Sequence, residues 1–212
     1  MTRHILTAAR VAAFGLMITA GARAAHAEDI TPPQMPGPIV VDEEGNEPFL
    51  LGHGFGTQNY VCAPSATSAT GVAFTLFTPQ ATLFNDEGKQ LITHFFSPNS
   101  DPTVKPPEAG TIRVTWEDSR DSSRVWAMLL QQSSEAPFVQ PDAVAWLKLQ
   151  TVGVDAGTIG PGRLTKVTFI QRVNTVGGLA PKTGCSTLAD LGSRAFVPYS
   201  ADYIFYRESH TN

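Results

Sequence analysis

The stretch FIQRVNTVGGLAP, residues 169–181, places an amide where an apolar side chain is expected. Alternate residues of an extended strand share a face, so Gln171 points to the same side as Phe169 and Val173. A buried amide without hydrogen-bond partners costs about 1–3 kcal/mol. Gln171 therefore either bonds to neighbouring backbone or lines a cavity in which a ligand completes its hydrogen bonds.

A carboxylate stands among aromatic residues in PYSADYIFYR, residues 198–207. One face of this stretch carries aromatic and small side chains, namely those of Tyr199, Ala201, Tyr203 and Phe205. Asp202 lies on the other face, and Arg172 is the natural cation for it if the two strands are neighbours. The pair is then either a structural ion pair or a clamp for a ligand.

His94 lies in ITHFF, on one face with Ile92 and Phe96. Such a histidine is either a hydrogen-bonded residue of the core or rim, or a general base. No metal site is expected, since the sequence has no H-x-H, H-x-x-x-H or H-E-x-x-H motif. No cofactor is expected either, because GHGFG, residues 52–56, lacks the third glycine of a phosphate-binding loop and favours a bend before a strand.

Residues 1–27 have the three parts of a secretory signal peptide. Arg3 and Arg10 form the charged start, an apolar run follows over 11–20, and Ala25-His26-Ala27 fits a cleavage site. No other stretch approaches the ~18 apolar residues of a spanning helix, so we expect no membrane span in the mature chain. The predicted location is outside the cytoplasm, either the periplasm or the medium.

The net charge of the mature chain limits the classes of partner that it is expected to bind. The segment 1–27 holds three arginines and no acid, so its removal changes the formal net charge from −4 to −7. A chain of this charge has no basic stripe for phosphates, which argues against nucleic acid as a partner. The partner we expect is a small molecule or a polymer.

Cys62 and Cys185 are the only two cysteines of the chain. In an oxidising compartment they are expected to form a disulfide, because no C-x-x-C motif indicates a redox pair. The chain-entropy model gives such a long loop a stabilisation of roughly 4–5 kcal/mol as an upper figure.

Short alternating runs separated by Gly, Pro, Asn and Asp predict an all-β domain over residues 48–212. We expect one domain with few or no helices, as an antiparallel β-sandwich or a partly closed β-barrel. The segment 28–47 is rich in proline and acids and predicts an extended leader, with one short edge strand over 39–42. The expected core strands span 58–63, 72–78, 81–85, 91–96, 111–117, 124–131, 145–152, 164–174 and 202–207. The one candidate helix lies in CSTLADLGS, residues 185–193, where Ser186 is the expected cap.

Five segments carry a resemblance to a known family: GTQNYVC, THFF, AWLKL, VTFIQRVNTVGGLAPKTGC and PYSADYIFYR. Together they resemble an exported domain of unknown function that occurs in many bacteria and in secreted fungal proteins. The resemblance covers roughly residues 48–207, and it implies a compact β-rich extracytoplasmic domain without an established activity. The chain departs from the common pattern at Asp121-Ser122-Ser123, where many members have Asp-Gly-Ser.

The sequence favours a ligand-binding module over an enzyme. The expected pocket is built from polar groups on an apolar wall, namely Gln171, Arg172, Asn174, Asp202 and Tyr203, with Gln58, Tyr60 and His94 nearby. One alternative is a hydrolase or lyase on an envelope or extracellular polymer, with His94 or Asp202 as general base and Arg172 as anion stabiliser. Another is an envelope structural or adhesion module, in which these residues only satisfy one another.

Overall fold

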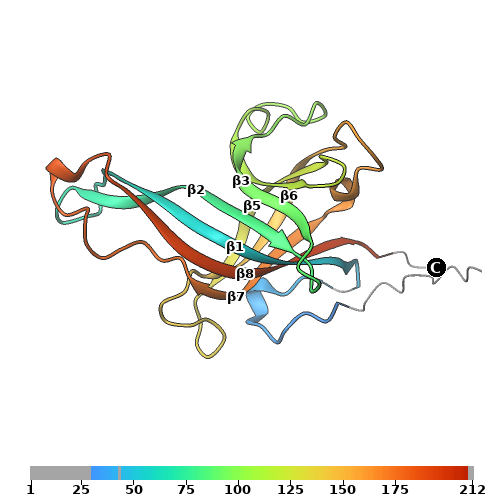
Figure 1. Ribbon diagram of the computed structural model, residues 1–212, viewed down its shortest axis with the longest axis horizontal. Helices are drawn as coiled ribbons and strands as arrows, with labels where there is room; N and C mark the ends of the chain where they lie inside the picture. The colour runs from blue at the N-terminus through green and yellow to red at the C-terminus, as the bar shows by residue number, and fades with distance from the viewer. Residues whose placement is uncertain (1–29, 43, 210–212) are drawn as a thin grey trace, which may run out of the picture.

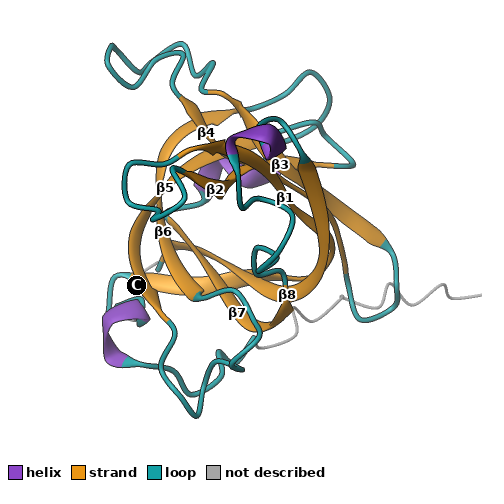
Figure 2. Ribbon diagram, turned by 90° about the vertical axis from the view of Figure 1, so that its left-hand side faces the viewer, coloured by secondary structure: helices purple, strands orange, loops and turns teal. Residues whose placement is uncertain are grey.

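The computed structural model describes residues 30–42 and 44–209, so the predicted signal peptide lies outside the described part. Within that part, eight antiparallel strands form a closed barrel in which consecutive strands are neighbours and β1 pairs with β8. Figure 2 looks into this ring. The prediction of a single all-β domain is confirmed, and the barrel is closed rather than partly closed.

The strands are long, and the helical segments of the described residues are single turns. The strands are β1 (Asn46–Pro64), β2 (Val72–Phe84), β3 (Gln90–Pro98), β4 (Ile112–Asp118), β5 (Arg124–Ser133), β6 (Trp146–Asp155), β7 (Phe169–Gly177) and β8 (Arg194–Glu208). The 3₁₀ turns are η1 (Gly37–Ile39), η2 (Arg163–Lys166) and η3 (Leu188–Asp190). The predicted helix in 185–193 is therefore only η3, which Thr187 and Asp190 cap in place of Ser186.

The two strands predicted over 72–78 and 81–85 are one continuous strand, β2. Pro79 lies in its middle, where β2 pairs with Gln58 of β1, and its pairing with β3 begins only at Ala81. At Pro79 the edge of β2 that faces β3 has no strand partner, so no ladder hydrogen bond to β3 is lost there. A proline is tolerated at such an open edge, and the strand continues through it.

Parts of β1, β2 and β8 extend beyond the ring as a three-stranded arm, formed by residues 57–64, 72–80 and 194–198 (Figure 1). The glycines of GHGFG lie inside β1, so the predicted bend before a strand is wrong. A Cβ at Gly54 would lie 2.9 Å from the Tyr203 ring, and one at Gly56 would collide with the backbone of Gln80. The absence of side chains at these positions lets β2 and β8 approach β1 closely where the arm leaves the ring.

The predicted disulfide between Cys62 and Cys185 is present, with Cα atoms 5.4 Å apart. Cys62 lies on the arm, and Cys185 lies in the long connection between β7 and β8. The bond fastens this connection to the arm, where the backbone of Cys62 also bonds to Ser193 and Gly192.

Alternation along the strands separates an inner core from an outer one. The inner core fills one end of the ring, and its fully buried members include Leu83, Ile92, Leu164, Ile170 and Phe205. The outer core lies against β6, β7 and β8 and is formed with residues of the leader, namely Ile39, Val41, Trp146, Val173, Ile204 and Tyr206. Both faces of β7 are therefore buried at Ile170 and Gln171, whereas Asn174 and Val176 are exposed.

Gln171 lies on the outer face of β7 beneath the leader. Its Nε2 donates a hydrogen bond to the carbonyl oxygen of Ile39 at 2.6 Å and also contacts the sulfur of Met35. The hydroxyl of Tyr206 donates to its Oε1. The predicted edge strand over 39–42 is absent, because the leader attaches through these side-chain contacts and the burial of Ile39 and Val41 rather than by strand pairing.

We predict that Gln171→Leu lowers the free energy of unfolding by about 1–3 kcal/mol, because the buried Ile39 carbonyl loses its donor while the side-chain volume is nearly kept. Urea unfolding of the two proteins measures this. Gln131→Leu, at an exposed position of β5, is the matched control. Equal stability of the two variants would show that this amide does not hold the leader.

Candidate functional site

The end of the lumen nearest the arm holds a cavity of about 530 Å³. Its wall is apolar and includes Val114, Ala127, Val144, Leu147 and Leu149. At its rim the apolar side chains are partly exposed, and these are Leu76, Ile112, Met128, Leu129 and Leu179. A volume of this size suits a small organic ligand.

Five of the eight residues predicted for the pocket line this one cavity. They are Gln58 and Tyr60 of β1, His94 of β3, Arg172 of β7 and Tyr203 of β8. The strand pairing explains why Arg172 and Tyr203 lie together, since they are opposite each other in the register of β7 and β8. The sequence predicted that four residues of β8 share one face, and the inner core contains all four: Tyr199, Ala201, Tyr203 and Phe205.

The other three predicted residues do not reach the lumen. Gln171 is under the leader, and Asn174 and Asp202 lie on the outer face, where the Asn174 amide donates to Asp202 Oδ2 at 2.8 Å. The predicted ion pair of Arg172 with Asp202 is wrong, because Asp202 lies opposite Val173 and points outward while Arg172 points inward. Asn174 leaves the alternation of β7 because it has a positive φ of 51° at an irregularity between Val173 and Val176.

His94 and Asp202 thus lie on opposite sides of the barrel wall. The predicted catalytic group, which needs both near one accessible point, is not assembled. The His94 ring stacks on Trp116 with centroids 4.4 Å apart, and its Nδ1 donates to the carbonyl oxygen of Thr115 at 3.0 Å. Burial lowers the pKa of His94 to about 3, against the opposing effect of that hydrogen bond, so the ring is neutral at physiological pH but only weakly basic, which does not suit the predicted role of general base.

Two phenols complete the polar end of the cavity. The Tyr60 hydroxyl donates to the carbonyl oxygen of Gly178 at 2.7 Å, and the hydroxyls of Tyr199 and Tyr203 are 3.0 Å apart. Burial raises the pKa of Tyr60 and of Tyr203, and the positive charge of Arg172 opposes the rise in both. Both phenols are therefore neutral donors near neutral pH.

Arg172 is one of two arginines that line the cavity. Its Nε and Nη2 donate to the carbonyl oxygen of Ala145 at 3.2 and 2.8 Å, and Tyr203 lies opposite it in the register of β7 and β8. Within residues 30–42 and 44–209, no carboxylate forms an ion pair with it. All its partners in the protein are neutral.

Trp116 belongs to the site although the sequence analysis did not identify it. It is 1% exposed, and together with Gln58, which is 2% exposed, it lines the cavity. Trp116 Nε1 and Gln58 Nε2 are buried donors without an acceptor in the described part of the protein. The alternation of Ile112, Val114 and Trp116 on one face of β4 is the signal that could have identified the tryptophan.

A second polar cluster lies on the outer face, around His53. Its Nδ1 is 2.7 Å from Asp202 Oδ1, and its Nε2 is 2.8 Å from Asp86 Oδ1. Burial acts to lower the pKa of His53, but hydrogen bonds and charge from Asp202 and Asp86 outweigh it and raise the pKa. The histidine is thus held between two carboxylates that favour its charged form.

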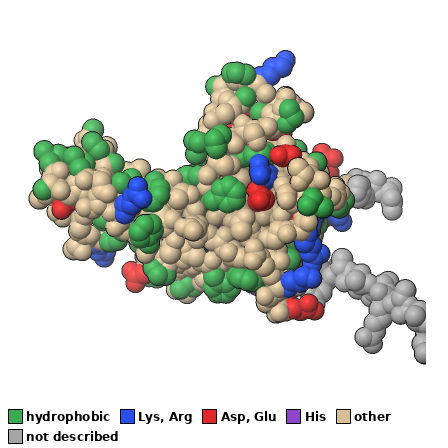
Figure 3. Space-filling model, turned by 45° about the horizontal axis from the view of Figure 1, so that its top comes forward, with side chains coloured by type: hydrophobic (Ala, Val, Ile, Leu, Met, Phe, Trp, Pro, Cys, Tyr) green, Lys and Arg blue, Asp and Glu red, His purple; other side chains and the backbone are tan. Residues whose placement is uncertain are grey.

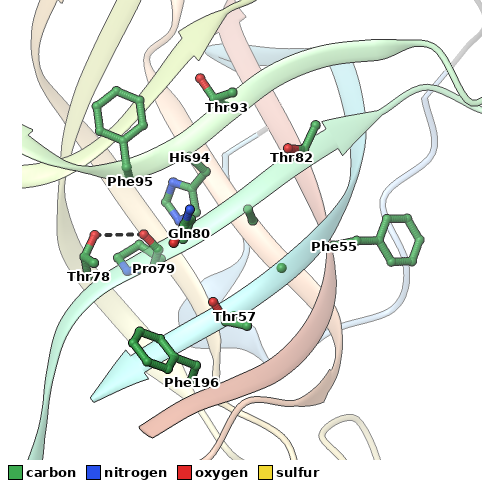
Figure 4. A pocket seen from close by; sticks show the side chains of 12 residues that line it. Phe55, Thr57, Thr78, Pro79, Gln80, Thr82, Thr93, His94, Phe95 and Phe196 are labelled. Carbon is green, nitrogen blue, oxygen red and sulfur yellow. Dashed lines mark hydrogen bonds between the residues drawn. The ribbon is translucent and has the colours of Figure 1, made fainter. Parts of the chain in front are cut away.

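A second, more open cavity of about 810 Å³ lies where β1 and β2 leave β3, and His94 also lines it (Figure 4). Phe55 and Phe196 flank it, and each is 58% exposed. Other apolar side chains gather at the free end of the arm (Figure 3). The arm therefore presents apolar groups to solvent, whereas the lumen combines apolar and polar groups.

The described residues contain neither a metal-binding cluster nor a membrane-spanning helix. No group of three or more His, Cys, Asp or Glu side chains that could hold a metal ion is found in the part of the chain that the structure describes. Over the same residues, none of the helical segments has the length and hydropathy to cross a membrane.

Comparison with known proteins gives one family match. The model described as "Protein of unknown function (DUF3455)" matches residues 44–207. No curated protein and no solved structure matches the chain. The match agrees with the predicted resemblance to an uncharacterised domain family, and it supplies no activity or ligand.

The raised pKa of His53 predicts a pH-dependent contribution to stability. A histidine with a folded pKa above its unfolded value of about 6.5 stabilises fully below that value, and the contribution is lost as the pH rises through the folded pKa. His53→Gln keeps a polar side chain but cannot titrate. The wild-type advantage in unfolding free energy over this variant should therefore shrink by up to about 1 kcal/mol between about pH 6 and pH 9.

Urea unfolding at several pH values measures this difference. His94 does not confuse it, because its pKa of about 3 lies outside the window and it is present in both proteins. A constant difference across the range would show that the two carboxylates do not favour the charged ring.

Proposed function

Because the chain belongs to the family DUF3455, whose members are described only as proteins of unknown function, we propose a function from its geometry: the domain binds a small amphipathic molecule in the barrel lumen. The observation that carries the proposal is the cavity of about 530 Å³ itself. Apolar side chains form its wall and rim, and polar donors gather at its inner end. This is the usual composition of a ligand pocket.

The buried donors of Gln58 and Trp116 support the proposal. A buried N–H without an acceptor costs about 1–3 kcal/mol, so an acceptor that reached either group would stabilise the protein. Acceptor atoms of a ligand would satisfy both groups. Their position beside Arg172 and Tyr203 suits a ligand whose polar end lies deepest and whose apolar part extends toward Leu129 and Leu179 at the rim.

The place of action that we propose is outside the cytoplasm. The disulfide between Cys62 and Cys185 supports it, because such bonds persist in oxidising compartments. The predicted signal peptide and the resemblance to an exported family point the same way. The binding module would then take up its ligand from the periplasm or the medium.

The adhesion module is the second candidate, and one observation favours it. Phe196 on the arm and Phe55 at the base of the arm are each 58% exposed, and exposed apolar groups often mark an interaction surface. In this alternative the lumen takes no ligand. The experiment below therefore separates the two candidates.

We predict that the protein takes up N-phenylnaphthylamine, a neutral probe that fluoresces in apolar surroundings, and that blocking the lumen abolishes this. Ala127 is buried in the cavity wall, so Ala127→Trp should reduce the affinity at least about tenfold, the equivalent of ~1.4 kcal/mol of lost burial. Leu147→Trp, at a partly buried position of the same wall, gives a second obstruction that the fold accommodates more easily.

Leu130→Trp is the control, because Leu130 is on the same strand as Ala127 but is 41% exposed and does not line the cavity. Circular dichroism establishes that each variant is folded. Absence of uptake by the wild type would overturn the lumen as a binding site, and so would equal affinity of the Leu147 and Leu130 variants.

A further inference from the structure

The charge balance of the lumen identifies a class of ligand. Among the described residues that line the cavity there is no Asp or Glu, but there are two arginines, Arg113 and Arg172. The carboxylate of Glu108 pairs with Arg113 through both of its oxygens, which neutralises that charge. Among the residues that the structure describes, no carboxylate pairs with Arg172, so its charge in the cavity is not compensated there.

The cost of this charge is a reason to expect an anion. A partly buried cation is stabilised poorly by neutral dipoles, and on the described part of the chain the hydrogen bonds of Arg172 go to the carbonyl oxygen of Ala145. A ligand oxyanion would replace the lost hydration of the guanidinium with a charge-assisted hydrogen bond. The planar fork of arginine suits carboxylate, sulfonate and phosphate groups alike.

The surrounding groups fit an acceptor rather than a donor. Gln58 Nε2 and Trp116 Nε1 are donors without an acceptor, and both residues line the cavity with Arg172. Indole nitrogen and guanidinium can only donate. A neutral alcohol or amine offers fewer acceptor lone pairs than an oxyanion, and a cationic ligand would be repelled by Arg172.

We propose, building on the lumen-binding function above, that the ligand is an apolar or aromatic acid whose single oxyanion contacts Arg172, with Gln58 and Trp116 as further donors. Its apolar part lies against the wall near Leu147 and Leu149. Arg172 thus determines specificity for charge, while the wall contributes affinity for any apolar molecule that fits.

Two probes with the same ring system test this. N-phenylnaphthylamine is neutral, and anilinonaphthalene sulfonate adds one sulfonate to it. Wild-type protein should bind the anionic probe about tenfold or more tightly, the range of a charge-assisted hydrogen bond. In Arg172→Gln the ratio of the two affinities should fall to about one, and Arg172→Lys should keep part of the preference.

Lys148→Gln is the matched control for charge. Lys148 is on the neighbouring strand β6, but it lies on the outer face, where its Nζ donates to the carbonyl oxygen of Val40. Removing it takes away one positive charge outside the lumen, so the preference for the anionic probe should remain. Loss of the preference in this variant as well would attribute it to net charge and overturn the assignment to Arg172.

Competition against the bound anionic probe distinguishes the oxyanions. Decanoate and decyl phosphate, used below their micelle concentrations, should displace the probe, and the better competitor identifies carboxylate or phosphate as the preferred group. Decanol is the neutral control and should displace it at least about tenfold less well.

The outcomes separate this inference from the proposed function. If the neutral probe binds the lumen but the wild type shows no preference for the anion, or decanol competes as well as decanoate, the anionic ligand is wrong and the binding function stands. If neither probe binds, both fall. If Arg172→Gln does not fold, the wild-type preference and the Arg172→Lys variant still decide the question.

Discussion

Closure of the ring by the pairing of β1 with β8 is the constraint on which the site depends. The register runs from Asn46 opposite Glu208 to Val61 opposite Arg194, so the two ends of the domain are joined along most of both strands. A closed barrel has a defined inside, and every residue of a strand then faces either the lumen or the outer surface. The face on which a residue lies decides which polar groups can be neighbours. Arg172 and Tyr203 are cross-strand neighbours on the lumen face, whereas Asp202 lies on the outer face with His53.

The glycines of β1 and the disulfide make this closure compatible with a cavity. Gly54 and Gly56 allow β8 and β2 to approach β1 closely at the base of the arm. Immediately beyond them, Gln58 and Tyr60 carry full side chains into the space that the inner core does not fill. The bond of Cys62 to Cys185 holds the β7–β8 connection against the arm, and this connection supplies the Gly178 carbonyl that fixes the Tyr60 hydroxyl.

The sequence predicted the class of fold, the disulfide and the burial of Gln171 correctly, because alternation and cysteine count report on local geometry. It did not predict which side of the wall each face occupies. Both Ile170 and Gln171 are fully buried, so the usual contrast between a buried and a solvated face is absent from β7, and only the leader reveals that Gln171 lies outside. The strand register is the second feature that the sequence did not predict. A pair of Arg172 with Asp202 requires these two residues to lie opposite each other, and the actual register differs from that alignment by one residue.

The location of Arg172 also makes the proposed preference for an anion compatible with an acidic protein. The formal net charge of the chain is −4, so at long range the surface does not attract anions. Salt screens exposed charges beyond about 10 Å at 0.1 M ionic strength, which weakens this repulsion before a ligand reaches the rim. Inside the apolar lumen the effective dielectric constant is lower and screening is weaker, so one unpaired guanidinium outweighs the distant acids. On the function proposed above, selection by charge would take place after entry, at the guanidinium, and the apolar rim would admit the ligand by its hydrophobic part.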